Sequence, residues 1–206
     1  MKYGLECEFF VRNPVVGAFV GALHTSLTPD ECGFLAEARG KPYDNIREAV
    51  FSLKADIHRL EQAAKKLELE LVMVPNADVP FEAVMASRRQ FNKGVLSFQN
   101  LYGHAAHKEK RKKTAGIHIS FTKFTSFHYT TKDGSCEQSK SFTYQPMWDY
   151  VQIFRHLDKE FDKEIKEARR NPGFYELKHD GRIEYRSLPN TADLSKVIDV
   201  IEGFKF

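Results

Sequence analysis

The residues best suited to chemistry in this chain are acidic and imidazole side chains within apolar, strand-like segments. Glu6 and Glu8 are two residues apart in the apolar run at residues 2–11, so a strand there places both carboxylates on one face and Cys7 on the other. Clustered carboxylates with one imidazole form a ligand set that suits hard divalent cations such as Mg2+. The pattern therefore predicts a cation site on a sheet face.

Three further segments place polar side chains at alternate positions. These side chains are Glu37 and Arg39 in LAEARG, His118 in AGIHIS, and Arg182, Glu184 and Arg186 in RIEYR. A buried charge is unfavourable unless it is paired or binds an ion, so several such positions on one face require a common explanation. We predict that they converge on one concave face, with arginines at its edge holding phosphate or carboxylate groups. The predicted metal ligands are Glu6, Glu8, Glu37, His118 and Glu184.

Each segment also has a structural alternative. Alternating glutamates often form a solvated strand face, and the alternating charges of RIEYR could form a cross-strand ladder in a hairpin. Cys7 is expected in the core rather than as a nucleophile. His104 and His107 in LYGHAAH have helical spacing but no acidic neighbour, so surface or substrate-contact roles are favoured over metal binding.

A basic cluster precedes the His118 segment. It contains Lys108, Lys110, Arg111, Lys112 and Lys113. Charge runs are commonly solvated surface, and that interpretation stays open here. The sharper hypothesis is a segment that is mobile without ligand and closes over nucleotide phosphates or an acidic substrate, with Lys110 and Arg111 as nucleotide-binding residues.

The elements that position these residues are mostly paired strands. We expect strands at residues 2–11, 15–23, 33–39, 69–74, 114–122, 174–178 and 182–188, and helices at 46–67, 146–165 and 192–202. Asn45 is a predicted N-cap and Asp180-Gly181 a predicted hairpin turn, whereas residues 76–107 are expected to form functional loops or short helices. The predicted fold is α+β, a mainly antiparallel sheet with two long helices packed on one face and the other face free for chemistry.

Composition limits the class of protein. A length of 206 residues with 42% hydrophobic and 29% charged residues predicts one globular domain over residues 1–206. A formal charge of +3 is too near balance to argue for a nucleic-acid or membrane partner. Three cysteines without CxxC spacing argue against a disulfide framework or a finger-type zinc site. Because Glu6 and Glu8 interrupt the first apolar run and no long apolar segment follows, we expect a cytoplasmic protein without a membrane span.

Three short motifs together resemble a known superfamily. They are G-x-E-x-E at Gly4-Leu5-Glu6-Cys7-Glu8, G-x-H at Gly116-Ile117-His118, and R-x-E-x-R at Arg182-Ile183-Glu184-Tyr185-Arg186. Their order and spacing are similar to those of the carboxylate–amine ligases of the glutamine synthetase and glutamate–cysteine ligase superfamily. The short length and the DECGFLAEARGKP segment look most like the compact amidoligases of phage and bacterial gene clusters.

The resemblance implies a curved, funnel-like half-barrel that binds ATP with two or more Mg2+ ions. Glu6, His118 and Glu184 would hold the ion beside the transferring phosphate, and Glu8 with Glu37 the ion nearer the acceptor. Arg182, Arg186 and Arg39 would be the catalytic arginines, the first two neutralising phosphate charge. A carboxylate would be phosphorylated to an acyl phosphate, which an amine attacks to give an amide, ADP and phosphate, so no protein nucleophile is required.

Two other functions compete with the ligase. One is a nucleic-acid-binding or metal-dependent phosphodiester-cleaving protein that uses the basic cluster for backbone contacts and the acidic residues for metals. The other is an inactive structural relative, against which the intact motifs argue. For the ligase, the partners expected are a small-molecule or peptide carboxylate and an amine. Either this chain closes its own funnel or a partner subunit, as in a homo-oligomer, completes it.

Overall fold

The structure, a computed structural model, describes residues 2–30, 33–79, 95–100, 112–122, 145–178 and 182–204. Within these ranges the chain forms an α+β fold with an open, curved sheet. The sheet strands are β1 (Lys2–Arg12), β2 (Phe19–Val20), β3 (Ala36–Arg39), β4 (Glu70–Val72), β6 (Val95–Asn100), β8 (Ile117–Thr122), β9 (Phe174–Lys178) and β10 (Ile183–Tyr185). The helices are α1 (Ile46–Lys66), α3 (Gln145–Glu160), α4 (Asp162–Glu167) and α5 (Leu194–Glu202), with a 3-10 turn at Ala22–His24.

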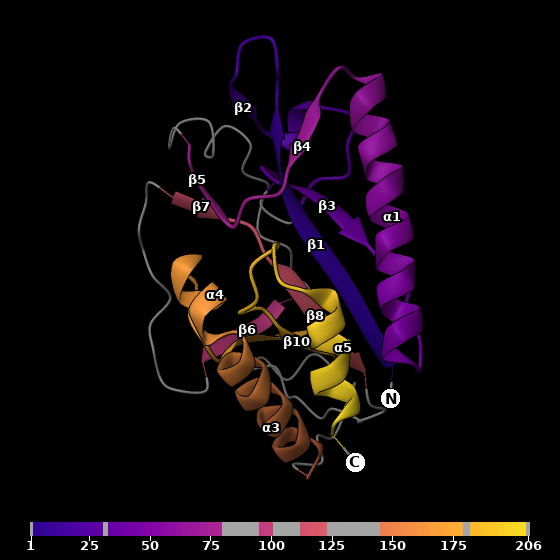
Figure 1. Cartoon of the computed structure of the whole chain (residues 1–206), viewed down its shortest axis with the longest axis vertical. Coiled ribbons are helices and arrows are strands. Elements are labelled where there is room, and N and C mark those ends of the chain that lie inside the picture. Colours follow the sequence, from indigo (N-terminus) through magenta and orange to yellow (C-terminus); the bar gives the residue numbers. More distant parts are fainter. Residues whose placement is uncertain are drawn as a thin grey trace, which may run out of the picture.

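The main sheet has the strand order β2-β1-β8-β10-β9-β6, and β3 and β4 also pair with β1. Every pairing between described strands is antiparallel, as predicted. A separate two-stranded sheet joins β5 (Asn76–Asp78) to β7 (Lys112–Thr114). The 11-residue strand β1 runs diagonally through the molecule and supplies partners to four other strands (Figure 1).

Alternation along the central strands separates an apolar face from a polar one. Leu5, Cys7 and Phe9 of β1 join a single hydrophobic core with alternate residues of β8 and β10 and with the buried faces of α1, α3 and α5. The intervening residues of β1, Glu6 and Glu8, lie on the opposite face because successive side chains of a strand point to opposite sides. The helices thus cover one face of the sheet, in agreement with the prediction.

Helix α1 begins and ends where the sequence indicates. The Asn45 side chain accepts a hydrogen bond from the Arg47 amide at 2.8 Å, which satisfies one of the free N–H groups of the first turn. Lys65 and Lys66 in the last turn complement the helix dipole. The helix lies alongside β1, and α5 packs against both α1 and α3 (Figure 1).

The prediction of two long helices is wrong, because among the described helices α1 alone has that length. The amphipathic segment expected at residues 146–165 is divided at Phe161 into the 16-residue α3 and the six-residue α4. Phe161 leaves helical geometry, with φ −113° and ψ 20°, while its side chain stays fully buried in the core beside Leu157 and Ile165. The apolar spacing continues across this bend, so periodicity does not reveal it.

Other element predictions need smaller corrections. Residues 76–107 contain two strands, β5 and β6, instead of loops or short helices alone. The strand expected at 114–122 divides, since β7 ends at Thr114 and β8 begins at Ile117, and the strand expected at 15–23 shrinks to β2. Lys112 and Lys113 belong to β7, so the main chain at the end of the basic cluster is in a strand.

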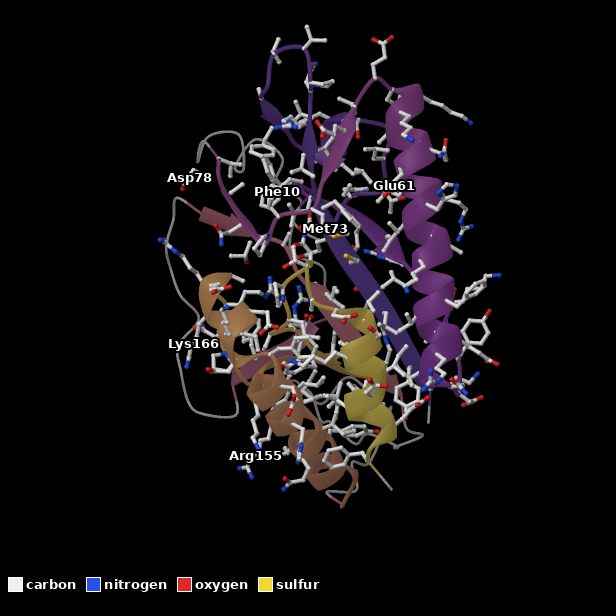
Figure 2. The ribbon with its side chains drawn as sticks, in the orientation of Figure 1. Phe10, Glu61, Met73, Asp78, Arg155 and Lys166 are labelled. Carbon is white, nitrogen blue, oxygen red and sulfur yellow. The ribbon has the colours of Figure 1, made fainter. Side chains whose placement is uncertain are left out.

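A second, smaller apolar cluster occupies the polar side of β1. Phe10, labelled in Figure 2, packs with Phe34, Leu35, Val79 and Ala115. Phe10 follows Glu6 and Glu8 on the same face of the strand, so this cluster bounds one end of the polar face. No helix within the described ranges is long and apolar enough to cross a membrane.

Candidate metal centre

The strand register brings the predicted ligands into three adjacent cross-strand rows on one face of the sheet. Glu6 of β1 lies directly opposite His118 of β8, and Ser120 of β8 lies opposite Glu184 of β10. On the other edge of β1, Glu8 is opposite Glu37 of β3. Four separate segments of the chain therefore contribute to one face, as expected from the sequence.

His118 lies at the centre of this group of side chains. Its Nδ1 lies 3.7 Å from Glu6 Oε2 and 3.7 Å from Glu184 Oε1, and its Nε2 lies 3.7 Å from Glu8 Oε2. Ligand atoms of Glu6, His118 and Glu184 all fall within 4.8 Å of one another. The three side chains could thus bind a single ion.

The imidazole of His118 is almost fully buried, with 2% of its surface exposed, yet neither ring nitrogen has a hydrogen-bond partner among the described residues. The distances of 3.7 Å to the carboxylates are too long for hydrogen bonds. A buried polar atom without a partner is unfavourable, so native proteins seldom retain one without a purpose. A cation between Nδ1 and the carboxylates of Glu6 and Glu184 would supply the missing partner.

Glu8 is held in place by the loop that precedes β8. Its Oε2 accepts a hydrogen bond from the Gly116 amide at 2.9 Å, and its main-chain carbonyl accepts one from Asn190 Nδ2 at 3.0 Å. Glu8 therefore faces Nε2 of His118 from a fixed position. This is the arrangement in which a carboxylate orients a metal-binding histidine.

Arg170 explains the glycine of the G-x-H motif. Its guanidinium donates to the main-chain carbonyls of Arg186 and Ser187 and to Thr114 Oγ1, so it joins the end of β10 to the end of β7. A Cβ on Gly116 would come within 2.6 Å of Arg170 Cζ. Burial lowers the pKa of Arg170 to about 10, and the Glu8 carboxylate acts in the opposite direction. Only glycine lets the guanidinium lie against this strand.

Glu6 and Glu37 interact with each other at the edge of the site. Burial, followed by the neighbouring Glu6 carboxylate, raises the pKa of Glu37 well above its ordinary value. Burial acts to raise the pKa of Glu6 as well, but His118, Glu37 and Arg39 outweigh it and hold that pKa far below its ordinary value. Glu37 thus retains a proton more readily than Glu6. Arg39 Nη2 lies 2.6 Å from Glu37 Oε2, which places this predicted catalytic arginine at the exposed rim.

Two buried charged residues of the site were missing from the sequence-based prediction. Glu176 and Lys178 of β9 lie on the polar face, and Glu176 is directly opposite Glu184. Lys178 Nζ is 2.8 Å from Glu176 Oε1, and Arg186 Nη1 is 2.7 Å from Glu176 Oε2 and 2.5 Å from Glu184 Oε1. The alternation of FYELK, next to RIEYR in the predicted hairpin, was the signal that could have identified them.

The structure thus brings Glu6, Glu8, Glu37, His118 and Glu184 together, with Arg39 and Arg186 in contact with their carboxylates. Arg182 is half-buried, two residues before Glu184. Cys7 is buried in the core on the opposite face, as predicted, and burial raises the pKa of its thiol. Lys110, Arg111, His104 and His107 lie outside the described residues. No protein-family model matches the chain, and a search of curated proteins found no match.

Proposed function

We propose that this chain is an ATP- and Mg2+-dependent ligase that joins a carboxylate to an amine through an acyl phosphate. The observation that carries the proposal is the buried His118 ring, whose two nitrogens lack hydrogen-bond partners in the described part of the chain and face the carboxylates of Glu6, Glu8 and Glu184 at 3.7 Å. The resemblance of the three motifs supports the choice of reaction. The geometry supports the cation on which that reaction depends.

The ligand set fits a hard divalent cation. Glu6 and Glu184 offer carboxylate oxygens and His118 offers Nδ1, which leaves further coordination positions for water or substrate oxygens. Glu8 would fix the ring by accepting a hydrogen bond from the Nε2–H group. Glu8 and Glu37, which lie opposite each other on β1 and β3, remain the predicted ligands of a second ion.

The charges around the site favour an anionic substrate once a cation is bound. The carboxylates of this face lie among cationic side chains. The carboxylates are Glu6, Glu8, Glu37, Glu176 and Glu184, and the cations are Arg39, Arg170, Lys178 and Arg186. A divalent cation at the site would add positive charge among these side chains. A polyphosphate that contacts the cation would offset that charge.

The residues present suit a reaction without a protein nucleophile. When bound, Mg2+ would offset negative charge on the phosphate oxygens. Arg186 lies beside Glu184 and would stabilise charge on the transferring group, while Arg39, at the exposed rim, would contact a carboxylate substrate. Cys7 is the thiol nearest the site in sequence, and it faces the core.

A hydroxylamine trap tests the proposal even while the amine substrate is unidentified, because hydroxylamine takes its place. The protein is incubated with ATP, Mg2+, hydroxylamine and pools of amino acids and other carboxylic acids, and hydroxamate is measured together with ADP. The proposal expects hydroxamate in at least one pool, in equal amount to ADP, and none without Mg2+. Glu184→Gln should abolish both products while keeping the fold, because the neutral amide fills the same volume.

The competing function makes a different prediction in the same samples. Cleavage of single- or double-stranded nucleic acid with Mg2+ alone, in the absence of hydroxamate from every pool, would replace the ligase by a metal-dependent phosphodiesterase. Loss of that cleavage in Glu184→Gln would then show that the same cation site serves it.

A further inference from the structure

Two adjacent strands carry a compact group of four charged residues beside the cation site. Glu176 and Lys178 come from β9, and Glu184 and Arg186 from β10 and its end. Each base contacts both acids, since Lys178 Nζ lies 2.8 Å from Glu176 and 3.7 Å from Glu184, and Arg186 lies 2.7 Å and 2.5 Å from the same two residues. The formal charges of these four side chains sum to zero.

One oxygen atom links this group to the cation site. Glu184 Oε1 lies 2.5 Å from Arg186 Nη1, 3.7 Å from Lys178 Nζ and 3.7 Å from His118 Nδ1. A cation bound between Glu6, His118 and Glu184 would therefore share the negative charge that now faces the two bases. Of the two carboxylates of this group, Glu176 would then be the one that still opposes Lys178 and Arg186.

We propose that Lys178 and Arg186 form a phosphate-binding subsite next to the cation, and that Glu176 is a built-in counter-ion that limits its affinity. The inference rests on the cation site of the proposed function and adds to it two residues, Lys178 and Glu176, and an order of binding. The cation would bind first, because it would draw the Glu184 charge away from the bases. Lys178 and Arg186 would then be available to contact a phosphate group that accompanies the cation.

The burial of Lys178 favours a phosphate group over a purely structural ion pair. Its side chain is 8% exposed, whereas Arg186 is 16% exposed and Glu6 22%, so the subsite opens toward solvent beside the cation. Lys178 Nζ lies 2.8 Å from Glu176 Oε1 and 3.7 Å from Glu184 Oε1, and these two carboxylates favour the charged ammonium. A cation that binds Glu184 would leave Lys178 with less negative charge beside it. Lys178 would then be suited to bind an anion that accompanies the cation.

The test is a pair of substitutions with opposite expected effects. Binding of inorganic pyrophosphate and of β,γ-methylene ATP is measured by calorimetry at saturating Mg2+. Lys178→Met should weaken both by about tenfold or more, the effect of one lost charge-assisted hydrogen bond. Glu176→Gln should tighten both, because it removes the competing negative charge. A gain in affinity cannot arise from a damaged fold, and Lys178→Gln serves as a second variant if the methionine is poorly tolerated.

Lys166→Met is the matched control. Lys166 pairs with Asp162 at 2.7 Å on the exposed side of α4, where Figure 2 shows it pointing away from the sheet. This variant should bind Mg2+ and both anions like the wild type. Weakening of β,γ-methylene ATP alone in Lys178→Met assigns the subsite to nucleotide phosphates, and equal weakening of pyrophosphate assigns it to phosphate groups in general.

The outcomes separate this inference from the function on which it rests. Unchanged anion binding in Lys178→Met, or weaker binding in Glu176→Gln, with Mg2+ affinity intact overturns the subsite and leaves the cation site standing. Absence of Mg2+ binding by the wild type overturns both. Pyrophosphate binding that is equally tight without Mg2+ overturns the proposed order, because the bases would then be available before any cation arrives.

Discussion

The two faces of the central sheet are built from the same strands and differ in what stabilises them. On the helix-covered face, side chains such as Phe121 and Tyr185 are fully buried among apolar neighbours and need no ligand. On the opposite face, His118 and Glu184 are as deeply buried among charges, and no described residue is a hydrogen-bond partner of the His118 nitrogens. The first face needs no ligand, whereas on the second face we propose that a cation supplies the missing partner.

Neighbouring residues of one strand therefore have different roles. In β8, Ile117, Ile119 and Phe121 stabilise the fold, while His118 and Ser120 lie between them on the polar face. A buried polar group lowers the stability of the fold unless it has a hydrogen-bond or ionic partner. Buried polar groups without such partners are concentrated at functional sites. Substitutions on the two faces should therefore separate stability from cation binding.

The largest effect is expected on the apolar face. Phe121→Ala removes a fully buried ring that contacts Tyr3, Tyr150 and Phe154, and should lower the free energy of unfolding by about 3–5 kcal/mol. Denaturant unfolding monitored by circular dichroism measures this change. The fraction that remains folded should still bind Mg2+ as the wild type does. A selective loss of cation affinity would show that the apolar face also determines cation binding.

His118→Asn should have the reverse profile. The asparagine cannot place a nitrogen between Glu6 and Glu184, so Mn2+ and Mg2+ affinity should fall by at least roughly tenfold to a hundredfold. Because the imidazole makes no hydrogen bonds within the described ranges, its loss should change the unfolding free energy of the cation-free protein far less than Phe121→Ala does. A destabilisation as large as that of Phe121→Ala, with cation affinity retained, would make His118 a structural residue.

The two faces were also unequally predictable from the sequence. Alternation in β1 placed Glu6 and Glu8 opposite Cys7, and the Asn45 cap located α1, because these signals depend on neighbouring residues alone. The bend at Phe161 and the strand β6 were missed, since the first interrupts a periodic pattern without changing it and the second depends on a distant partner, β9. Glu176 and Lys178 were missed although the predicted hairpin pairs their strand with RIEYR, because an acid and a base at alternate positions also fit a solvated strand face.

A double-mutant cycle sharpens the contrast at the edge of the polar face. Gly116→Ala should destabilise the protein by about 1–3 kcal/mol, because the new methyl group collides with the Arg170 guanidinium, which must then release its carbonyl partners. In the Arg170→Ala background, Gly116→Ala should lower the free energy of unfolding much less, since no guanidinium remains for the new methyl group to meet. Unfolding free energies of the four proteins measure the coupling, and strictly additive effects would show that Gly116 is required for another reason.

The smallest effect concerns the thiol of the apolar face. In a Cys32→Ser/Cys136→Ser background, Cys7 should resist alkylation by iodoacetamide at pH 8 in the native protein, because it is 1% exposed and burial raises the pKa of the thiol. It should react once the chain is unfolded in urea, as followed by mass spectrometry. Rapid labelling of the native protein would place Cys7 at an accessible surface and contradict the division between the two faces.

The most direct test of the cation site is electron paramagnetic resonance of the protein with Mn2+ in place of Mg2+. The wild type should bind Mn2+ saturably, and the bound ion should show nitrogen hyperfine coupling from the His118 ring. The coupling should be absent in His118→Asn. Glu176→Gln, which alters a neighbouring charge and no proposed ligand, should keep the coupling. Bound Mn2+ without nitrogen coupling, or no saturable binding at all, would contradict the central claim that His118, Glu6 and Glu184 hold a divalent cation.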